Sequence, residues 1–185
     1  MTLLDSMKKQ VTPQTMTTNR NRVEHVTFAS LPTSVEELEA LPEASLDSAF
    51  KTAALCIAVL CNWEKDANAT WEMLDYLKGP ENVNEREKAF IKDRLAGKSY
   101  KTLSFFQGAT PENGYTPDTP YTIAVSENPY SFEEENWAFL YVTSGGADSP
   151  RPIKLRRKPS TNQWFVNEIQ CLADIRIPTE QDPWA

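Results

Sequence analysis

The fold is decided by one stretch near the C-terminus: Arg151-Pro-Ile-Lys-Leu-Arg-Arg-Lys158, Pro159-Ser-Thr-Asn162, Gln163-Trp-Phe-Val-Asn-Glu-Ile169. Two strand-forming runs flank four residues that favour a turn, which is the signature of a β-hairpin. The implied register places Lys158 opposite Gln163, Arg157 opposite Trp164 and Leu155 opposite Val166. The sequence therefore predicts two antiparallel strands that end a sheet.

The two faces of this hairpin differ in chemistry. Because side chains alternate across a strand, one face carries a mostly apolar set: Ile153, Leu155, Arg157, Trp164 and Val166. Arg157 is expected to lie over the Trp164 ring as a cation–π pair. The other face shows a basic row, Lys154, Arg156 and Lys158. This row is either a site for an anionic partner or a solvated face that discourages edge pairing, and we favour the second interpretation.

Further strands are predicted upstream of the hairpin. The segments with alternating or β-branched residues are 23–28, 99–106, 121–125 and 137–143. The last of these alternates cleanly, with Trp137, Phe139 and Tyr141 on one face and smaller apolar residues on the other. Together with the hairpin, these segments predict an antiparallel meander.

Four helices are predicted in the N-terminal half: a short one within 33–41, then 47–61, 66–78 and 84–96. The expected N-terminal caps are Thr33 with Glu36 or Ser34 with Glu37, then Ser45 or Asp47, then Asn84 with Glu87. Gly79-Pro80 and Gly97 are typical helix ends. The helix 47–61 is apolar nearly all round, so it should be the buried central helix.

This order of elements predicts an α+β domain, with three to four N-terminal helices packed on an antiparallel meander sheet that ends in the C-terminal hairpin. A cone-shaped sheet around a helix, similar to the nuclear-transport-factor and cystatin-like architectures, would fit this pattern. Residues 1–21 are expected to be a flexible arm, because the first twenty are polar and lack periodicity. Residues 22–185 are expected to form one domain.

Composition narrows the possible partners. The 185 residues are 40% hydrophobic and include five Trp, which is enough for a real core. The net charge of -7 argues against binding to nucleic acid or to an anionic membrane surface. The charge is uneven, since residues 31–150 carry nine basic and twenty acidic side chains, whereas residues 151–185 carry six and four. The C-terminal segment is therefore the part suited to an acidic surface.

The cysteines and the apolar runs indicate a cytoplasmic protein. Cys56, Cys61 and Cys171 fit no zinc spacing, and we interpret them as buried reduced thiols of a reducing compartment. The N-terminus has no apolar run of the secretory type. The longest apolar stretch, 53–61, is far too short to cross a bilayer.

No catalytic or cofactor motif stands above chance. His25 is the sole histidine, and Gly145-Gly146 lacks the residues of a phosphate loop. The acidic run 133–135 matches no calcium loop, so neither a metal nor a cofactor is expected. The catalytic alternative is a small hydrolase or isomerase with a cone-like pocket, in which Asp148 or His25 acts as general base.

We favour a non-catalytic domain that binds an unidentified protein or small molecule. The expected surface combines the proline-rich loop 109–121, the loop 145–151 and the basic row. Its contacts would be stacking by Tyr115 and Tyr121, polar contacts from Asp148 and Arg151, and charge from Arg156.

Trp184 is a separate feature of the tail Asp182-Pro-Trp-Ala185. An exposed Trp lowers solubility, so we expect it to dock in a groove of its own domain, the alternative being a recognition tail for another protein. A third hypothesis is a structural homo-oligomer built from Trp184 and a strand edge.

The chain also resembles a family of uncharacterised bacterial proteins, mainly from Firmicutes, which is a domain of unknown function. The resemblance covers about residues 30–185 and rests on five segments: 31–38, 44–54, 108–117, 146–157 and Asp182-Pro-Trp184. It implies a bacterial, single-domain protein, and it implies no activity, cofactor or catalytic residue.

Overall fold

One antiparallel sheet organises the molecule. The computed structural model describes residues 21–185, so the predicted flexible arm lies almost entirely outside the described residues. Within that range the sheet has five strands in the spatial order of the sequence: β1 (Val23–Phe28), β2 (Tyr121–Ser126), β3 (Trp137–Val142), β4 (Arg151–Lys158) and β5 (Gln163–Ile169). The predicted α+β meander is confirmed.

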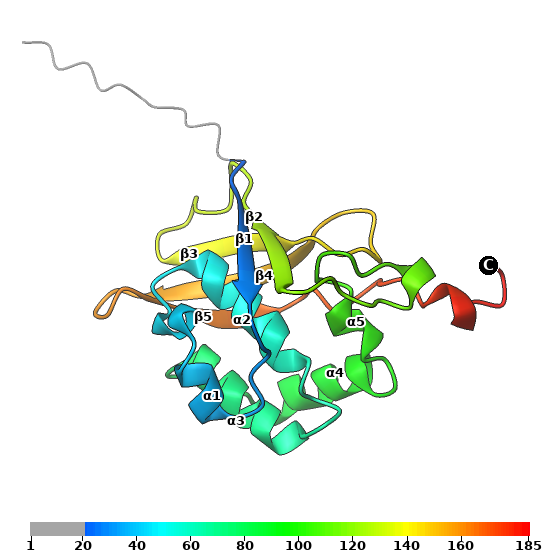
Figure 1. The fold of residues 1–185 in the computed structure, drawn as a ribbon. Coiled ribbons are helices and arrows are strands. Elements are labelled where there is room, and N and C mark those ends of the chain that lie inside the picture. Colours follow the sequence, from blue (N-terminus) through cyan, green and yellow to red (C-terminus); the bar gives the residue numbers. More distant parts are fainter. Residues whose placement is uncertain (1–20) are drawn as a thin grey trace, which may run out of the picture.

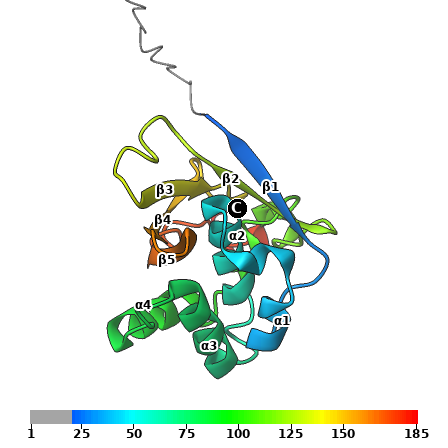
Figure 2. The same cartoon turned by 90° about the vertical axis from the view of Figure 1, so that its left-hand side faces the viewer.

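The helices lie on one side of this sheet, and no helix of residues 21–185 covers the other side (Figures 1 and 2). Their bounds are α1 (Val35–Glu39), α2 (Ala49–Leu60), α3 (Ala67–Lys78), α4 (Glu85–Leu95) and α5 (Tyr100–Leu103). The described residues also form three short 3-10 helices: η1 (Pro42–Ser45) between α1 and α2, η2 (Pro111–Asn113) between α5 and β2, and η3 (Thr179–Gln181) after β5. Among residues 21–185, no helix combines the length and the hydropathy that a bilayer span requires.

The core is built around α2. Every residue of α2 except Lys51 is buried, as its all-round apolar pattern predicts. The helix lies against all five strands, so the sheet curves around it. Small side chains such as Ala53, Ala54 and Ala58 allow this close approach and have no exposed surface.

Most predicted caps are confirmed. Ser34 caps α1 by accepting from the Glu37 amide, and Asn84 with Glu87 forms the capping box of α4. The cap of α2 differs, because Ser48 accepts from the Lys51 amide in place of Ser45 or Asp47. The reason is that Ser45 ends η1, so the chain must first turn through left-handed Leu46 before a new helix can begin.

The predicted strand 99–106 is wrong. This segment forms the single helical turn α5 and the bend after it, and only Phe106 makes an isolated bridge, to Ile123 of β2. The buried Lys101 fixes the turn by donating to the Leu172 carbonyl over 3.1 Å. Short apolar runs do not distinguish a strand from a buried helical turn.

The C-terminal hairpin has the predicted register. Lys158 pairs with Gln163, Arg157 with Trp164 and Leu155 with Val166, before a bulge shifts the register at Lys154. The Arg157 guanidinium lies 5.9 Å from the centre of the Trp164 ring, which confirms the expected cation–π pair.

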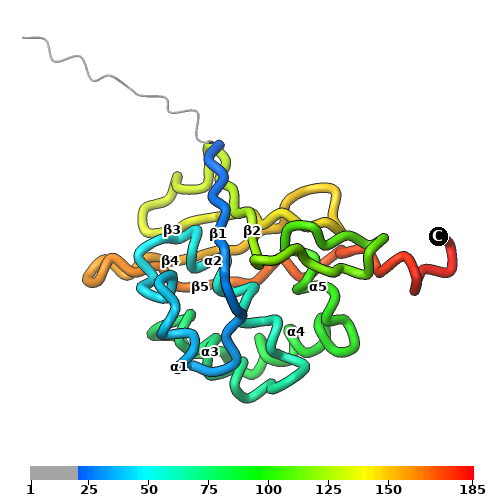
Figure 3. Tube along the Cα trace, in the orientation of Figure 1, coloured from blue at the N-terminus to red at the C-terminus, as the bar shows by residue number. Residues whose placement is uncertain are grey.

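The outer edge of β5, which lies beside the helical layer in Figure 3, is bonded to that layer. The Trp164 amide donates to the Leu46 carbonyl over 2.8 Å, and the Thr52 hydroxyl donates to the Trp164 carbonyl over 3.2 Å. Further along, the Lys78 ammonium donates to the Asn167 carbonyl over 3.1 Å. These bonds satisfy backbone groups that an edge strand normally leaves open.

Candidate functional site

A groove of about 290 Å³ lies between the β4–β5 hairpin and the connection from α3 to α4. We call it the hairpin groove. One wall comes from the hairpin and the other from residues that follow the end of α3. Its lining residues are Lys78, Pro80, Glu81, Arg156, Arg157, Lys158, Pro159, Phe165, Val166 and Asn167.

The rim of the hairpin groove is cationic. Arg156 keeps 57% of its side chain exposed, and its guanidinium lies 3.7 Å from the carboxylate of Glu81. Arg157 is more restrained, since its Nε donates to the Asn136 side chain over 3.0 Å. Lys158 is exposed beside the turn. Glu81 is the one acidic residue among the lining residues, so the groove carries net positive charge on an acidic chain.

The floor of the groove is apolar. Phe165 lies against the end of α3, and it is joined in the lining by Pro80 and Pro159. A Cβ at Gly79 would come within 2.5 Å of the Phe165 ring, and Gly79 also has a positive φ of 68°. Only glycine allows the helix to end here and the ring to pack against its backbone.

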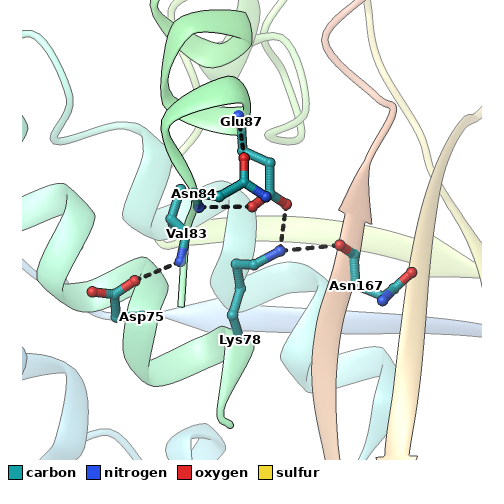
Figure 4. A network of polar contacts seen from close by, with 6 residues as sticks. All are labelled: Asp75, Lys78, Val83, Asn84, Glu87 and Asn167. Carbon is teal, nitrogen blue, oxygen red and sulfur yellow. Dashed lines mark hydrogen bonds and ion pairs between the residues drawn. The ribbon is translucent and has the colours of Figure 1, made fainter. Parts of the chain in front are cut away.

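A polar network fixes the α3–α4 wall (Figure 4). The side chain of Lys78 is only 7% exposed, and its ammonium donates to Glu87 and to the Asn167 carbonyl. The Asp75 carboxylate accepts from the Val83 amide over 2.7 Å. Glu87 also belongs to the capping box of α4, so one carboxylate ties the two helices to β5. The groove is therefore preorganised.

The neighbouring open face of the sheet carries aromatic rings. The Lys154 ammonium lies 4.5 Å from the centre of the Trp137 ring and 5.3 Å from that of Phe139. Lys154 also lies 3.7 Å from the Glu168 carboxylate. Lys154 is not among the lining residues, whereas Arg156 and Lys158 are. The Arg156 guanidinium also lies 5.2 Å from the centre of the Trp137 ring.

The two predicted tyrosines are placed differently. Tyr115 has no exposed surface, stacks on Tyr100 at 5.6 Å and donates its hydroxyl to the Arg176 carbonyl. Burial raises the pKa of Tyr115 to about 12. It is a core residue and offers no ring face to a ligand. Tyr121 is half-buried, with its ring edge against Phe106.

The surface expected from the two loops and the basic row is not one patch. The loops do meet each other, because the Gly145 amide donates to the Ser104 carbonyl and a Cβ at Gly145 would strike the Ala109 carbonyl. The basic row, however, ends at the hairpin turn, whereas the loops lie at the other end of β4 (Figure 1). An eight-residue strand separates its two ends by about 23 Å.

Asp148 has a basic neighbour and Arg151 has an acidic one. Arg176 donates to Asp148 over 2.7 Å, although the Asp148 side chain remains 96% exposed. Arg151 reaches Asp174 at 3.5 Å, and its buried Nε has no partner within the described part of the chain. Both residues lie with the loops, away from the hairpin groove.

Trp184 does not dock on its own domain. Its side chain is 93% exposed, so the expected intramolecular docking is wrong for this structure. The backbone amide of Trp184 donates to the Asp182 carboxylate over 2.9 Å.

The residues of the catalytic alternative are not enclosed. His25 is exposed at the mouth of a second, open hollow of about 370 Å³, and Asp148 faces solvent. In the described range, no three His, Cys, Asp or Glu side chains come together as a metal site. Cys56 is a buried free thiol whose pKa burial raises to about 12, which makes it a poor nucleophile.

A family model described as a domain of unknown function (DUF6935) matches residues 30–179. The chain belongs to this family. The DUF6935 match includes both walls of the hairpin groove and stops before Trp184. No curated protein matches the chain, and no solved structure matches it either.

Sequence reasoning found one wall of the groove and missed the other. The hairpin alternation identified Arg156 and Lys158, but Lys78, Glu81 and Phe165 were not singled out. Gly79-Pro80 was interpreted only as a helix end. The available signal was a lysine in the last turn of an amphipathic helix, directly before that glycine.

Proposed function

We propose that this protein is a non-catalytic binding module whose hairpin groove takes a short acidic, aromatic segment of a partner protein. The observation that carries the proposal is a cationic rim above an apolar floor on a chain of net charge -7. Arg156 and Lys158 supply the charge, and Phe165 supplies the apolar contact. For these two cations the proposal takes the first of the two interpretations of the basic row, a site for an anionic partner.

The dimensions of the groove favour a peptide side chain with flanking carboxylates. A volume of about 290 Å³ holds one large side chain, and it is small for a whole cofactor. Guanidinium groups bind carboxylates through paired hydrogen bonds and also lie on aromatic rings. A fixed wall lowers the ordering cost of binding, because Lys78 and Glu87 already hold it in place.

Fluorescence polarisation tests this proposal with a labelled synthetic peptide of Glu, Asp, Pro and Trp residues. A peptide with Lys in place of its acidic residues is the ligand control. The protein variants are Arg156→Glu and Lys158→Glu, and Lys98→Glu is the matched control because Lys98 is also exposed but is not a groove residue.

We expect the acidic peptide to bind the wild type and the Lys98→Glu variant equally. Each groove variant should weaken binding by roughly tenfold, which corresponds to about 1.4 kcal/mol. Equal binding of the acidic and basic peptides, or no effect of the groove variants, would reject the proposal.

The organism and the cellular compartment are part of the same proposal. We propose that this is a bacterial protein that works in the cytoplasm, from a family found mainly in Firmicutes. The three free thiols support the compartment, since reduced cysteines are typical of the cytoplasm. The bacterial origin rests on the resemblance of the sequence segments described above.

A further inference from the structure

The C-terminal tail presents Trp184 from a fixed base. The Arg176 amide donates to the Gly146 carbonyl over 2.9 Å, and the Arg176 carbonyl accepts from the buried Tyr115 hydroxyl. η3 then packs near η2, and the Asp182 amide donates to the Thr179 carbonyl. The chain is therefore held up to the last turn before the indole. A backbone held in this way reduces the ordering cost that the tail would otherwise incur on binding.

The chemistry of the tail complements the hairpin groove. Glu180 and Asp182 provide negative charge on the segment that carries the exposed indole. The groove offers two exposed cations, Arg156 and Lys158, and the Phe165 ring is also part of its lining. An indole also attracts guanidinium groups through its ring face.

A tail cannot reach the groove of its own chain in this structure. η3 and the residues after it lie at one end of the molecule, and the hairpin turn lies at the opposite end (Figures 1 and 3). A second molecule placed alongside in the reverse direction brings each tail to the other molecule's groove. Such an arrangement has two-fold symmetry and closes on itself.

We propose that the protein forms a reciprocal dimer in which the hairpin groove of each copy takes Trp184 of the other, with Glu180 and Asp182 facing Arg156 and Lys158. This inference rests on the proposed function of the groove and names its occupant. Each contact is smaller than a standard protein interface. The dimer is therefore weak and concentration-dependent, and its two contacts reinforce each other because they join the same two molecules.

Sedimentation velocity over a range from about 5 µM to about 500 µM tests the dimer. The variants are Trp184→Ala and the double variant Arg156→Glu/Lys158→Glu, with Lys98→Glu as the exposed control. Circular dichroism checks that each variant folds. The decisive sample mixes the tail variant with the groove variant, because only a mixed pair retains one intact contact.

We expect the wild type and Lys98→Glu to approach the mass of a dimer as concentration rises. Each tail or groove variant alone should dissociate at concentrations at least tenfold higher, and the mixture should recover part of the association. A general loss of stability would not produce this recovery. A wild type that stays monomeric throughout, or a Trp184→Ala variant that associates like the wild type, would overturn the dimer.

The peptide assay separates this inference from the proposed function. If the acidic peptide binds the groove while the wild type remains monomeric, the dimer is rejected and the proposed function stands. If neither the peptide nor the tail binds, both are rejected.

Discussion

The ammonium of Lys78 lies behind the wall of the groove with little access to solvent, and its two acceptors come from different elements. Glu87 belongs to α4, and the Asn167 carbonyl belongs to β5. A buried charge without a partner costs far more than an exposed ion pair gains. The geometry of the groove wall therefore depends on one carboxylate.

We predict that Glu87→Ala lowers the free energy of unfolding by about 2 kcal/mol or more, because it leaves the Lys78 ammonium uncompensated. The double variant Lys78→Met/Glu87→Leu should lose less than this single variant, since no charge remains buried. Urea denaturation measures both. The exposed pair Glu85–Lys88 is the control, and Glu85→Ala should cost less than about 0.5 kcal/mol. Equal losses at Glu85 and Glu87 would contradict the burial argument.

At the scale of single residues, the sequence predicted a contact between side chains better than it predicted how exposed individual side chains are. The cation–π pair of Arg157 and Trp164 follows from strand alternation and a turn of known length. The burial of Tyr115 does not, because its environment is made by Tyr100 and Arg176, which are distant in sequence. The exposure of Trp184 likewise depends on how η3 packs, which no local pattern encodes.

Among the elements, α2 is the one around which the core is built. Its first turn also makes a contact between the helical layer and β5. Ser48 caps the helix with its hydroxyl, and its carbonyl accepts from the Thr52 hydroxyl over 3.0 Å. The same Thr52 hydroxyl contacts the Trp164 carbonyl of β5. The first turn of α2 therefore sets both the helix and the sheet edge.

We predict that Ser48→Ala lowers the free energy of unfolding by about 1 kcal/mol, which is typical of a lost N-cap. Asp47→Ala and Ser45→Ala, at the positions that the sequence favoured, should each change it by less than about 0.5 kcal/mol. Thermal or urea unfolding of the three variants distinguishes the cap. A larger loss at Asp47 than at Ser48 would show that the cap lies earlier.

Helices that local chemistry marks were predictable, and the unmarked turn α5 was not. α3 and α4 have a capping side chain at the start and a glycine at or near the end, so local chemistry defined them. α5 has neither a capping side chain nor a long apolar period. Its turn depends on the long-range bond from Lys101 to Leu172, and local sequence patterns do not encode such a bond.

On the scale of the whole molecule, the charge of the groove is opposite in sign to the net charge of the chain. The chain carries a net charge of -7, yet its groove is lined by more cations than anions. Charges farther apart than the Debye length are screened in salt, whereas charges in contact are screened less. The response to salt therefore reports which charges govern binding.

We predict that raising salt from about 50 mM to about 500 mM weakens binding of the acidic peptide severalfold, because contacts with Arg156 and Lys158 dominate. If repulsion by the whole chain dominated, salt would strengthen binding. Fluorescence polarisation at several salt concentrations measures the direction. The basic control peptide should show no comparable loss.

The order and type of most elements could be predicted from the sequence, whereas the complete groove could not. Helices before strands and a meander follow from local periods and short connections. The groove needs Pro80 and Phe165 to meet across more than eighty residues of chain, and that meeting depends on how α3 packs on β5. Strand alternation identified its cations, and only the packed structure supplied its floor.

The bonds between β5 and the helical layer have a consequence for the dynamics of the molecule. By position β5 is the last strand, and the amides of such a strand normally exchange with solvent through local fraying. Here the Trp164 amide is released only when η1 and the start of α2 detach. Deuterium uptake at the Trp164 amide therefore follows the opening of the two layers, and this edge amide has the protection expected of an interior strand.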